Sequence, residues 1–106
     1  MSLEAELTEE LRGTYEAARK RGYVATYFLQ MLEEHGGKIT AIKLLSKQEI
    51  QPGLMRLAEI GLLDESMEAV IVKDKYKSLF NKHEKIFLEE ARRRLEELNY
   101  TKKDTP

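Results

Sequence analysis

The sequence lacks cysteine, long apolar runs and a strong net charge, and each absence excludes a class of protein. None of its 106 residues is cysteine, which excludes a disulfide framework and a thiolate metal site. No apolar run approaches the roughly 20 residues that a membrane-spanning helix needs, so we expect no membrane association. The acidic N-terminus has no apolar stretch and is not typical of a signal peptide. Together these features predict a cytoplasmic protein.

The net charge is only −1, which argues against strong nucleic-acid binding by the chain as a whole. The charges are nevertheless uneven. All charged side chains of residues 1–11 are acidic, whereas residues 12–82 have an excess of lysine and arginine. Acidic groups near the start of a helix stabilise its dipole, so the acidic start needs no functional explanation. The mildly basic middle is the part that favours an anionic partner.

Sequence motifs that carry enzyme chemistry are missing as well. There is no G-x-x-x-x-G-K-[ST] phosphate loop, no G-x-G-x-x-G turn and no G-x-S-x-G elbow. The histidines are limited to His35 and His83, whereas a metal site normally needs three or four ligands. We therefore expect a protein that is not an enzyme, with no catalytic residue, no metal and no cofactor.

What the sequence does contain is the apolar periodicity of amphipathic helices. Apolar residues recur three and four positions apart over residues 24–35, which predicts a helix with one buried stripe. The stripe consists of Val24, Tyr27, Phe28, Met31, Leu32 and His35. The Gly36-Gly37 pair predicts its end, because glycine adopts the left-handed cap conformation at little steric cost.

The same periodicity predicts helices along most of the chain. The other expected helices are residues 3–21, residues 39–46, residues 52–61, a short helix capped by Ser66, and a last helix opened by a capping box over residues 81–84. Residues 69–72 are rich in β-branched side chains and could form a strand, but the spacing of Met67, Val70 and Ile71 favours a helix. We predict an all-α fold, a compact orthogonal bundle of roughly five to seven short helices, with residues 24–35 and 52–61 at its centre.

We expect a single domain over residues 1–106, with a possibly protruding first helix at 1–21, a core at 22–100 and a frayed polar tail at 101–106. The apolar stripe of the first helix is thin and consists of Leu3, Leu7, Leu11 and Ala18. Such a stripe favours cover by a second chain, and a twofold homodimer through residues 3–21 is the commonest solution. The alternative is that this helix folds back over the second helix. A protein partner, or a second copy, is therefore expected.

Residues 39–63 also look like a helix–turn–helix, with residues 52–60 as the recognition helix and residues 62–75 as a wing. The possible nucleic-acid contacts are Lys38, Lys43, Lys47 and Arg56. Arg56 is the only cation of the proposed recognition helix, and acidic residues in the proposed wing would repel phosphate. DNA binding is thus the alternative to a non-enzymatic interaction module.

From Tyr27 to about Leu98 the sequence resembles a small helical module of bacteria and archaea, found alone or beside nuclease-like domains of restriction and defence proteins. The matching segments are YFLxMLxxxGG, AxxLL and GxxxLxxxGxLD, followed by Ser66, Glu68, Ala69, Val70, Tyr76, Leu79, Phe80, Ala91, Arg94 and Leu95. The family often has a proline where this chain has Ala25. The resemblance covers roughly two thirds of the chain and implies a helical fold and an accessory role in a nucleic-acid-related or defence system, with no assigned catalytic residue.

Overall fold

The computed structural model describes residues 1–100, and the polar tail predicted over residues 101–106 lies outside the described residues. The described part contains five α-helices, two 3₁₀ helices and no strand. They are α1 (Leu3–Lys20), α2 (Thr26–Leu45), α3 (Pro52–Glu59), η1 (Leu63–Glu65), α4 (Met67–Ile71), η2 (Asp74–Leu79) and α5 (Lys85–Glu97). The predicted all-α class is therefore confirmed, and residues 69–72 form the end of α4 and its C-cap instead of a strand.

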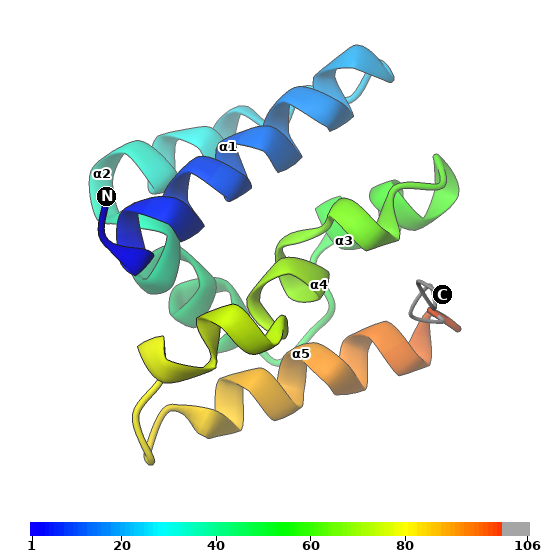
Figure 1. Cartoon of the computed structure of the whole chain (residues 1–106). Helices are drawn as coiled ribbons and strands as arrows, with labels where there is room; N and C mark the ends of the chain where they lie inside the picture. Colours follow the sequence, from blue (N-terminus) through cyan, green and yellow to red (C-terminus); the bar gives the residue numbers. More distant parts are fainter. Residues whose placement is uncertain (101–106) are drawn as a thin grey trace, which may run out of the picture.

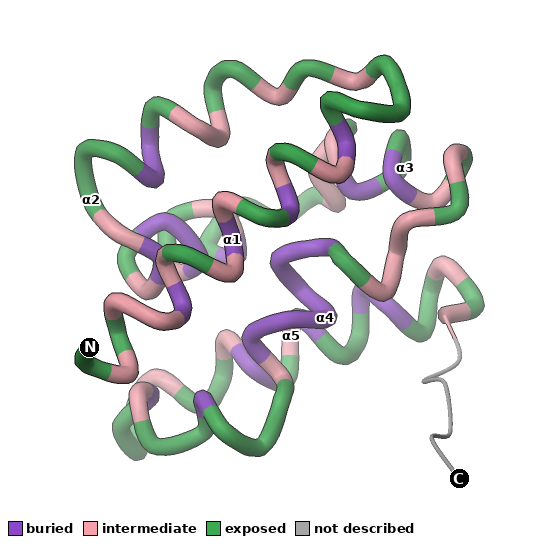
Figure 2. Tube along the Cα trace, turned by 45° about the horizontal axis from the view of Figure 1, so that its top comes forward, coloured by how far each residue is buried: buried purple, intermediate pink, exposed green. Residues whose placement is uncertain are grey.

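The short helix α4 is the centre of the molecule. It lies between the α1–α2 pair and α5 (Figure 1), and all of its residues are buried (Figure 2). Its predicted N-cap is confirmed, because Ser66 Oγ accepts a hydrogen bond from the backbone N–H of Ala69 at 3.1 Å. The main core cluster comprises Leu7, Leu11, Leu32, Ala41, Leu45, Met67, Val70, Ile71, Tyr76, Phe80, Leu88 and Ala91. Since α3 contributes nothing to this cluster and packs mainly on η1, the prediction that residues 52–61 are central is wrong.

Helix α1 packs along α2 (Figure 1). Leu7 and Leu11, the middle of its thin stripe, are fully buried within the chain. On its other flank, the buried Tyr76 of η2 donates a hydrogen bond to Glu10 Oε1 at 2.5 Å. Most of the stripe that was expected to need a second chain, from Leu7 to Ala18, is therefore covered by the chain itself. The homodimer through residues 3–21 stays a prediction.

The Gly36-Gly37 pair explains how so thin a stripe closes the α1–α2 interface. Gly36 has φ 78° and ψ 171°, a combination that is essentially restricted to glycine, so α2 is divided by a kink where a stop was predicted. Gly37 resumes the helix and faces α1. A Cβ on Gly37 would lie 3.0 Å from Leu7 Cγ and 3.2 Å from the backbone N of Thr8, and its N–H donates to Thr8 Oγ1 at 2.9 Å. With no side chain between them, the two backbones approach closely.

The stripe predicted over residues 24–35 is only partly buried. Met31 and Leu32 are buried and Phe28 is half-buried against the core, as the periodicity predicted. Val24 and Tyr27, however, are 56% and 66% exposed, and His35 is exposed as well. The predicted burial of these three residues is therefore wrong. Val24 and Tyr27 stand beside a pocket instead of inside the core.

Caps lie at the predicted boundaries of three other helices. Gly22 and Gly61 have positive φ, and each follows the C-cap residue of its helix, α1 or α3. Before α5, the backbone N–H of Glu84 donates to Asn81 Oδ1 at 3.0 Å, and Glu84 Oε1 accepts from the backbone N–H of Asn81 at 2.9 Å. This reciprocal pair is a capping box.

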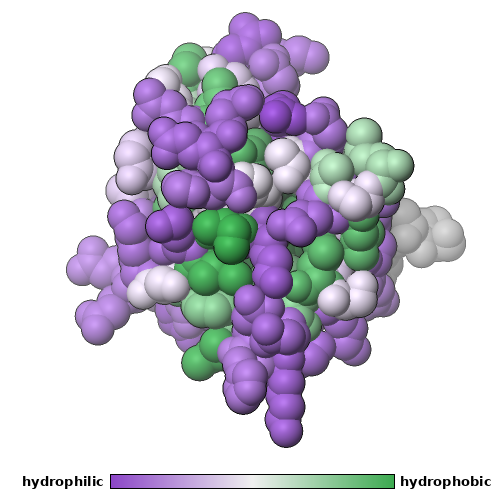
Figure 3. Space-filling model, turned by 90° about the vertical axis from the view of Figure 1, so that its left-hand side faces the viewer, coloured by the Kyte–Doolittle hydropathy of each residue, from purple (hydrophilic) through white to green (hydrophobic). Residues whose placement is uncertain are grey.

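The surface formed by the start of α1, the bend of α2 and the η2–α5 connection is mixed in character. Its apolar areas are small and separated by hydrophilic side chains (Figure 3), as is usual for a surface that faces solvent. Within residues 1–100, no helix combines the length and the apolar character that a membrane span requires.

Candidate functional site

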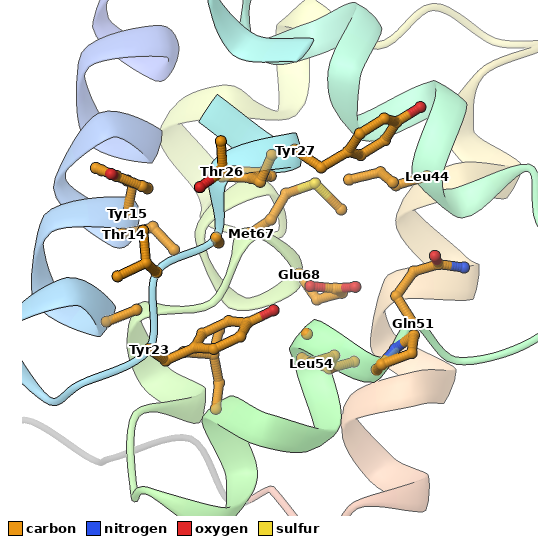
Figure 4. Close-up of a pocket in the computed structure, with 17 residues that line it drawn as sticks. Thr14, Tyr15, Tyr23, Thr26, Tyr27, Leu44, Gln51, Leu54, Met67 and Glu68 are labelled. Atoms are coloured by element: carbon orange, nitrogen blue, oxygen red, sulfur yellow. The ribbon is translucent and has the colours of Figure 1, made fainter. Parts of the chain in front are cut away.

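A pocket of about 420 Å³ opens where the second half of α1 and the starts of α2, α3 and α4 meet (Figure 4). This volume lies in the usual range of ligand pockets, about 300–1,000 Å³. The walls are mostly apolar, with the rings of Tyr15, Tyr23, Tyr27 and Phe28 and the aliphatic side chains of Leu44, Leu54, Leu57 and Met67. Val24 and Tyr27 stand at the rim, where they are exposed to solvent.

Contacts between distant segments hold the walls of the pocket in place. Arg21 Nη2, just after α1, donates to the carbonyl of Ile60 at the end of α3 at 2.9 Å. Gly53, in the first turn of α3, leaves room for the ring of Tyr23, because a Cβ there would lie 3.1 Å from Tyr23 Oη. Thr14 Oγ1 of α1 donates to the carbonyl of Glu65 at 2.6 Å, which ties α1 to the segment before α4. The pocket is therefore part of the tertiary structure and not a gap beside a loose loop.

Among the described residues that line the pocket, Glu68 of α4 is the only charged one. Glu68 is only 4% exposed, and its carboxylate points into the pocket (Figure 4). Within residues 1–100, the only hydrogen bond to this carboxylate comes from its own backbone N–H. Buried carboxylates are normally paired with a cation or with several donors, so this group is unusual.

Burial raises the pKa of Glu68 to about 6, although its own backbone N–H and the positive charge of Arg94 on α5 partly oppose the shift. Near neutral pH the carboxyl is therefore mostly ionised inside an apolar pocket. A perturbed carboxyl in a concave site is a recognised sign of a binding or catalytic position.

We expect the stability of the chain to fall by about 2 kcal/mol as the pH rises from 4.5 to above 6, because folding raises the pKa of Glu68. The protonated form is the one that the fold stabilises, so its contribution is complete below the ordinary value of 4.5. Urea unfolding at several pH values measures this loss. Glu10 and Glu90 have lowered pKa values. Their ionised forms stabilise the fold, and this stabilisation is lost as the pH falls below the ordinary value of a glutamate.

The variant Glu68→Gln should lack this loss, while Glu96→Gln, which changes an exposed glutamate of α5, should follow the wild-type curve. Identical pH dependence of Glu68→Gln and the wild type would contradict the assignment to Glu68.

A second buried charge, Arg94 of α5, fixes the far wall of the pocket. Arg94 is fully buried, and its Nε donates to Glu90 Oε2 at 2.7 Å. Its terminal nitrogens donate to the carbonyls at the end of α2, with Leu44 at 3.4 Å and Lys47 as partners. Hydrogen bonds from Arg93 and then from Arg94 lower the pKa of Glu90 to about 2. Arg94 thus caps α2 from another helix and positions Leu44, a wall residue of the pocket.

Comparisons of the chain with protein-family models, with curated proteins and with solved structures give no match.

The structure places the four basic residues predicted as nucleic-acid contacts outside the pocket. Lys38 Nζ pairs with Glu84 Oε1 at 3.0 Å, and Arg56 Nη1 pairs with Glu59 Oε2 at 2.9 Å. Lys43 and Lys47 are exposed at the end of α2. The wing of the helix–turn–helix interpretation is not present, since residues 62–75 form η1, α4 and the start of η2. Nucleic-acid binding by these residues stays a prediction.

Two further features of the described residues concern metal ligands and the burial of Glu68. The part of the chain described by the structure holds no cluster of three His, Cys, Asp or Glu residues that could bind a metal ion. Glu68 lies in the first turn of a helix capped by Ser66, where an acidic residue is ordinarily explained by the helix dipole. Glu68 is buried only because α4 lies at the centre of the molecule.

Proposed function

We propose that this chain is a non-enzymatic interaction module whose pocket receives a side chain of a protein partner. The observation that carries the proposal is the combination of a mostly apolar pocket with an exposed apolar rim. Val24 and Tyr27 expose more than half of their surfaces beside the opening. Apolar side chains leave water favourably when a partner covers them, so this rim is suited to contact with another molecule.

The shape of the site favours a protein partner that inserts an anchor. Binding energy at protein interfaces concentrates in a few anchors that fill pockets, and tyrosine is enriched among these residues. Tyr27 at the rim and Tyr23 within the wall provide ring surfaces of this kind. The resemblance of the sequence to a module near restriction and defence proteins suggests that the partner belongs to such a nucleic-acid-related or defence system.

Selection of a library of random peptides against the folded full-length chain tests the proposal. We expect selected peptides whose Kd rises at least about tenfold when both rim residues are changed, in the variant Val24→Ser with Tyr27→Ser. Both positions are exposed, so the variant should remain folded, as a ¹H–¹⁵N spectrum would show.

A matched control is Ile86→Ser, which removes an equally exposed apolar side chain, 62% accessible, from the start of α5. This control should leave the Kd unchanged. Peptides that lose equal affinity on both variants, or none on the rim variant, would show that the pocket is not the binding site.

A further inference from the structure

We propose that the pocket takes a basic side chain, arginine or lysine, with its cationic end at Glu68 and its apolar stem against the aromatic wall. The source of that side chain, a protein partner, rests on the function proposed above. The chemistry of the site rests on separate observations of the pocket itself.

The first observation is that no cation within residues 1–100 makes a hydrogen bond to the carboxylate of Glu68. Arg94, whose charge acts on Glu68, makes its hydrogen bonds elsewhere, to Glu90 and to the carbonyls of Leu44 and Lys47. A carboxylate can accept several hydrogen bonds, and the oxygens of Glu68 face the pocket (Figure 4). A guanidinium or ammonium group entering the pocket would therefore meet acceptor positions for which residues 1–100 provide only the N–H of Glu68 itself.

The second observation is the aromatic character of the walls. Tyr15, Tyr23, Tyr27 and Phe28 all line the same pocket. Aromatic rings attract cations through their negative faces, and the attraction strengthens where water is excluded. The same rings and the side chain of Leu54 offer apolar contact to the methylene stem of a long basic residue, which carries its charge only at the tip.

Other ligand classes fit this site less well. An anionic group would face the negative charge of Glu68, and the described residues that line the pocket include no cation to offset the repulsion. A purely apolar group would remove water from the ionised carboxylate and give it no partner, which is costly. Electrostatic complementarity therefore selects a cation with an apolar stem.

A pair of small probes that differ only in charge tests the inference. n-Butylguanidinium resembles the end of arginine, and n-butylurea is its neutral counterpart. We expect butylguanidinium to shift the backbone amide signals of Tyr23, Leu54 and Glu68 in ¹⁵N-labelled full-length protein, with a Kd at least about tenfold lower than that of butylurea. In Glu68→Gln the two probes should bind alike, whereas Glu96→Gln should keep the wild-type preference.

A measurement on the unaltered protein makes the test independent of any variant. Of the charged groups on α1, α2, η1 and α5, the elements packed on α4, Arg94 is the only one in the described residues that acts on Glu68. Butylguanidinium stays charged across this range, so its affinity should rise about tenfold from pH 5 to pH 7 as Glu68 ionises. The affinity of butylurea should stay flat.

The outcomes separate this inference from the proposed function. Equal binding of the two probes to the wild type, or a preference that survives in Glu68→Gln, overturns the inference, even if selected peptides bind at the rim. A charge preference that requires Glu68 supports it, even if no peptide is selected, in which case the proposed protein partner fails and the cation site stands.

Discussion

Replacing Arg94 by leucine is expected to destabilise the chain by about 3–5 kcal/mol. Arg94 is fully buried and is shared between Glu90 of α5 and the carbonyls that end α2. Leucine fills part of the volume but donates no hydrogen bond. The carbonyls of Leu45 and Lys47 would lose this donor, whereas the carbonyl of Leu44 would keep the N–H of Lys47 as a partner. A buried polar group left without a partner costs about 1–3 kcal/mol. Urea unfolding followed by circular dichroism measures the change.

Arg92→Leu is the matched control, because Arg92 lies two residues earlier on the same helix and is exposed. Its effect should stay within about 0.5 kcal/mol. Arg94→Lys should recover only part of the loss, since an ammonium group cannot reproduce the planar fork of donors that reaches both Glu90 and α2. Equal effects of Arg94→Leu and Arg92→Leu would mean that the buried guanidinium does not hold α5 to α2.

Replacing Gly37 by valine is expected to cost about 3 kcal/mol, because it forces α1 and α2 apart. A Cβ at this position would already lie 3.0 Å from Leu7 Cγ, 3.2 Å from Leu11 Cδ1 and 3.2 Å from the backbone N of Thr8. The backbone atom cannot move aside as a flexible side chain could. The separation would also weaken the hydrogen bond from Gly37 N–H to Thr8 Oγ1. Thermal and urea unfolding measure the loss.

The same substitution at Gly13 provides the control. Gly13 lies inside α1, and a Cβ there would have no heavy atom within 4 Å. Valine is a slightly better helix former than glycine, so Gly13→Val should be neutral or should stabilise the chain by about 0.3 kcal/mol. A neutral Gly37→Val would contradict the close approach of the two helices.

Local chemistry made most of the helices predictable from the sequence. Caps depend only on neighbouring backbone groups, and they lie at the ends of the helices predicted over residues 3–21 and 52–61, at Ser66 and at residues 81–84. The break at Gly36 follows from the same local rule. The spacing of Met67, Val70 and Ile71 predicted a helix and not a strand, and the structure confirms it. Periodicity, like capping, is a local property of the sequence.

The elements of the candidate site were present in the sequence, but their roles were not. Val24 and Tyr27 continue the same stripe as Leu32, yet α2 begins beyond the reach of the core, so its first turn lines a pocket. In the sequence, Glu68 has the position of an ordinary acidic residue near a helix start. Arg94 has glutamates three and four residues away, as surface arginines of helices often do. Periodicity shows which residues share a face of a helix, but it does not show what covers that face.

The sequence by itself determined the all-helical class, the positions of most helix ends and the break at residues 36–37, because each depends on contacts within a few residues. Only the tertiary structure decided that α4 lies at the centre, that α1 is covered by the chain itself, and that Glu68 and Arg94 are buried. Those outcomes depend on how helices distant in sequence pack together. A short helix enclosed on all sides buries its charged residues together with its apolar ones, and that enclosure places a carboxyl on the floor of an apolar pocket.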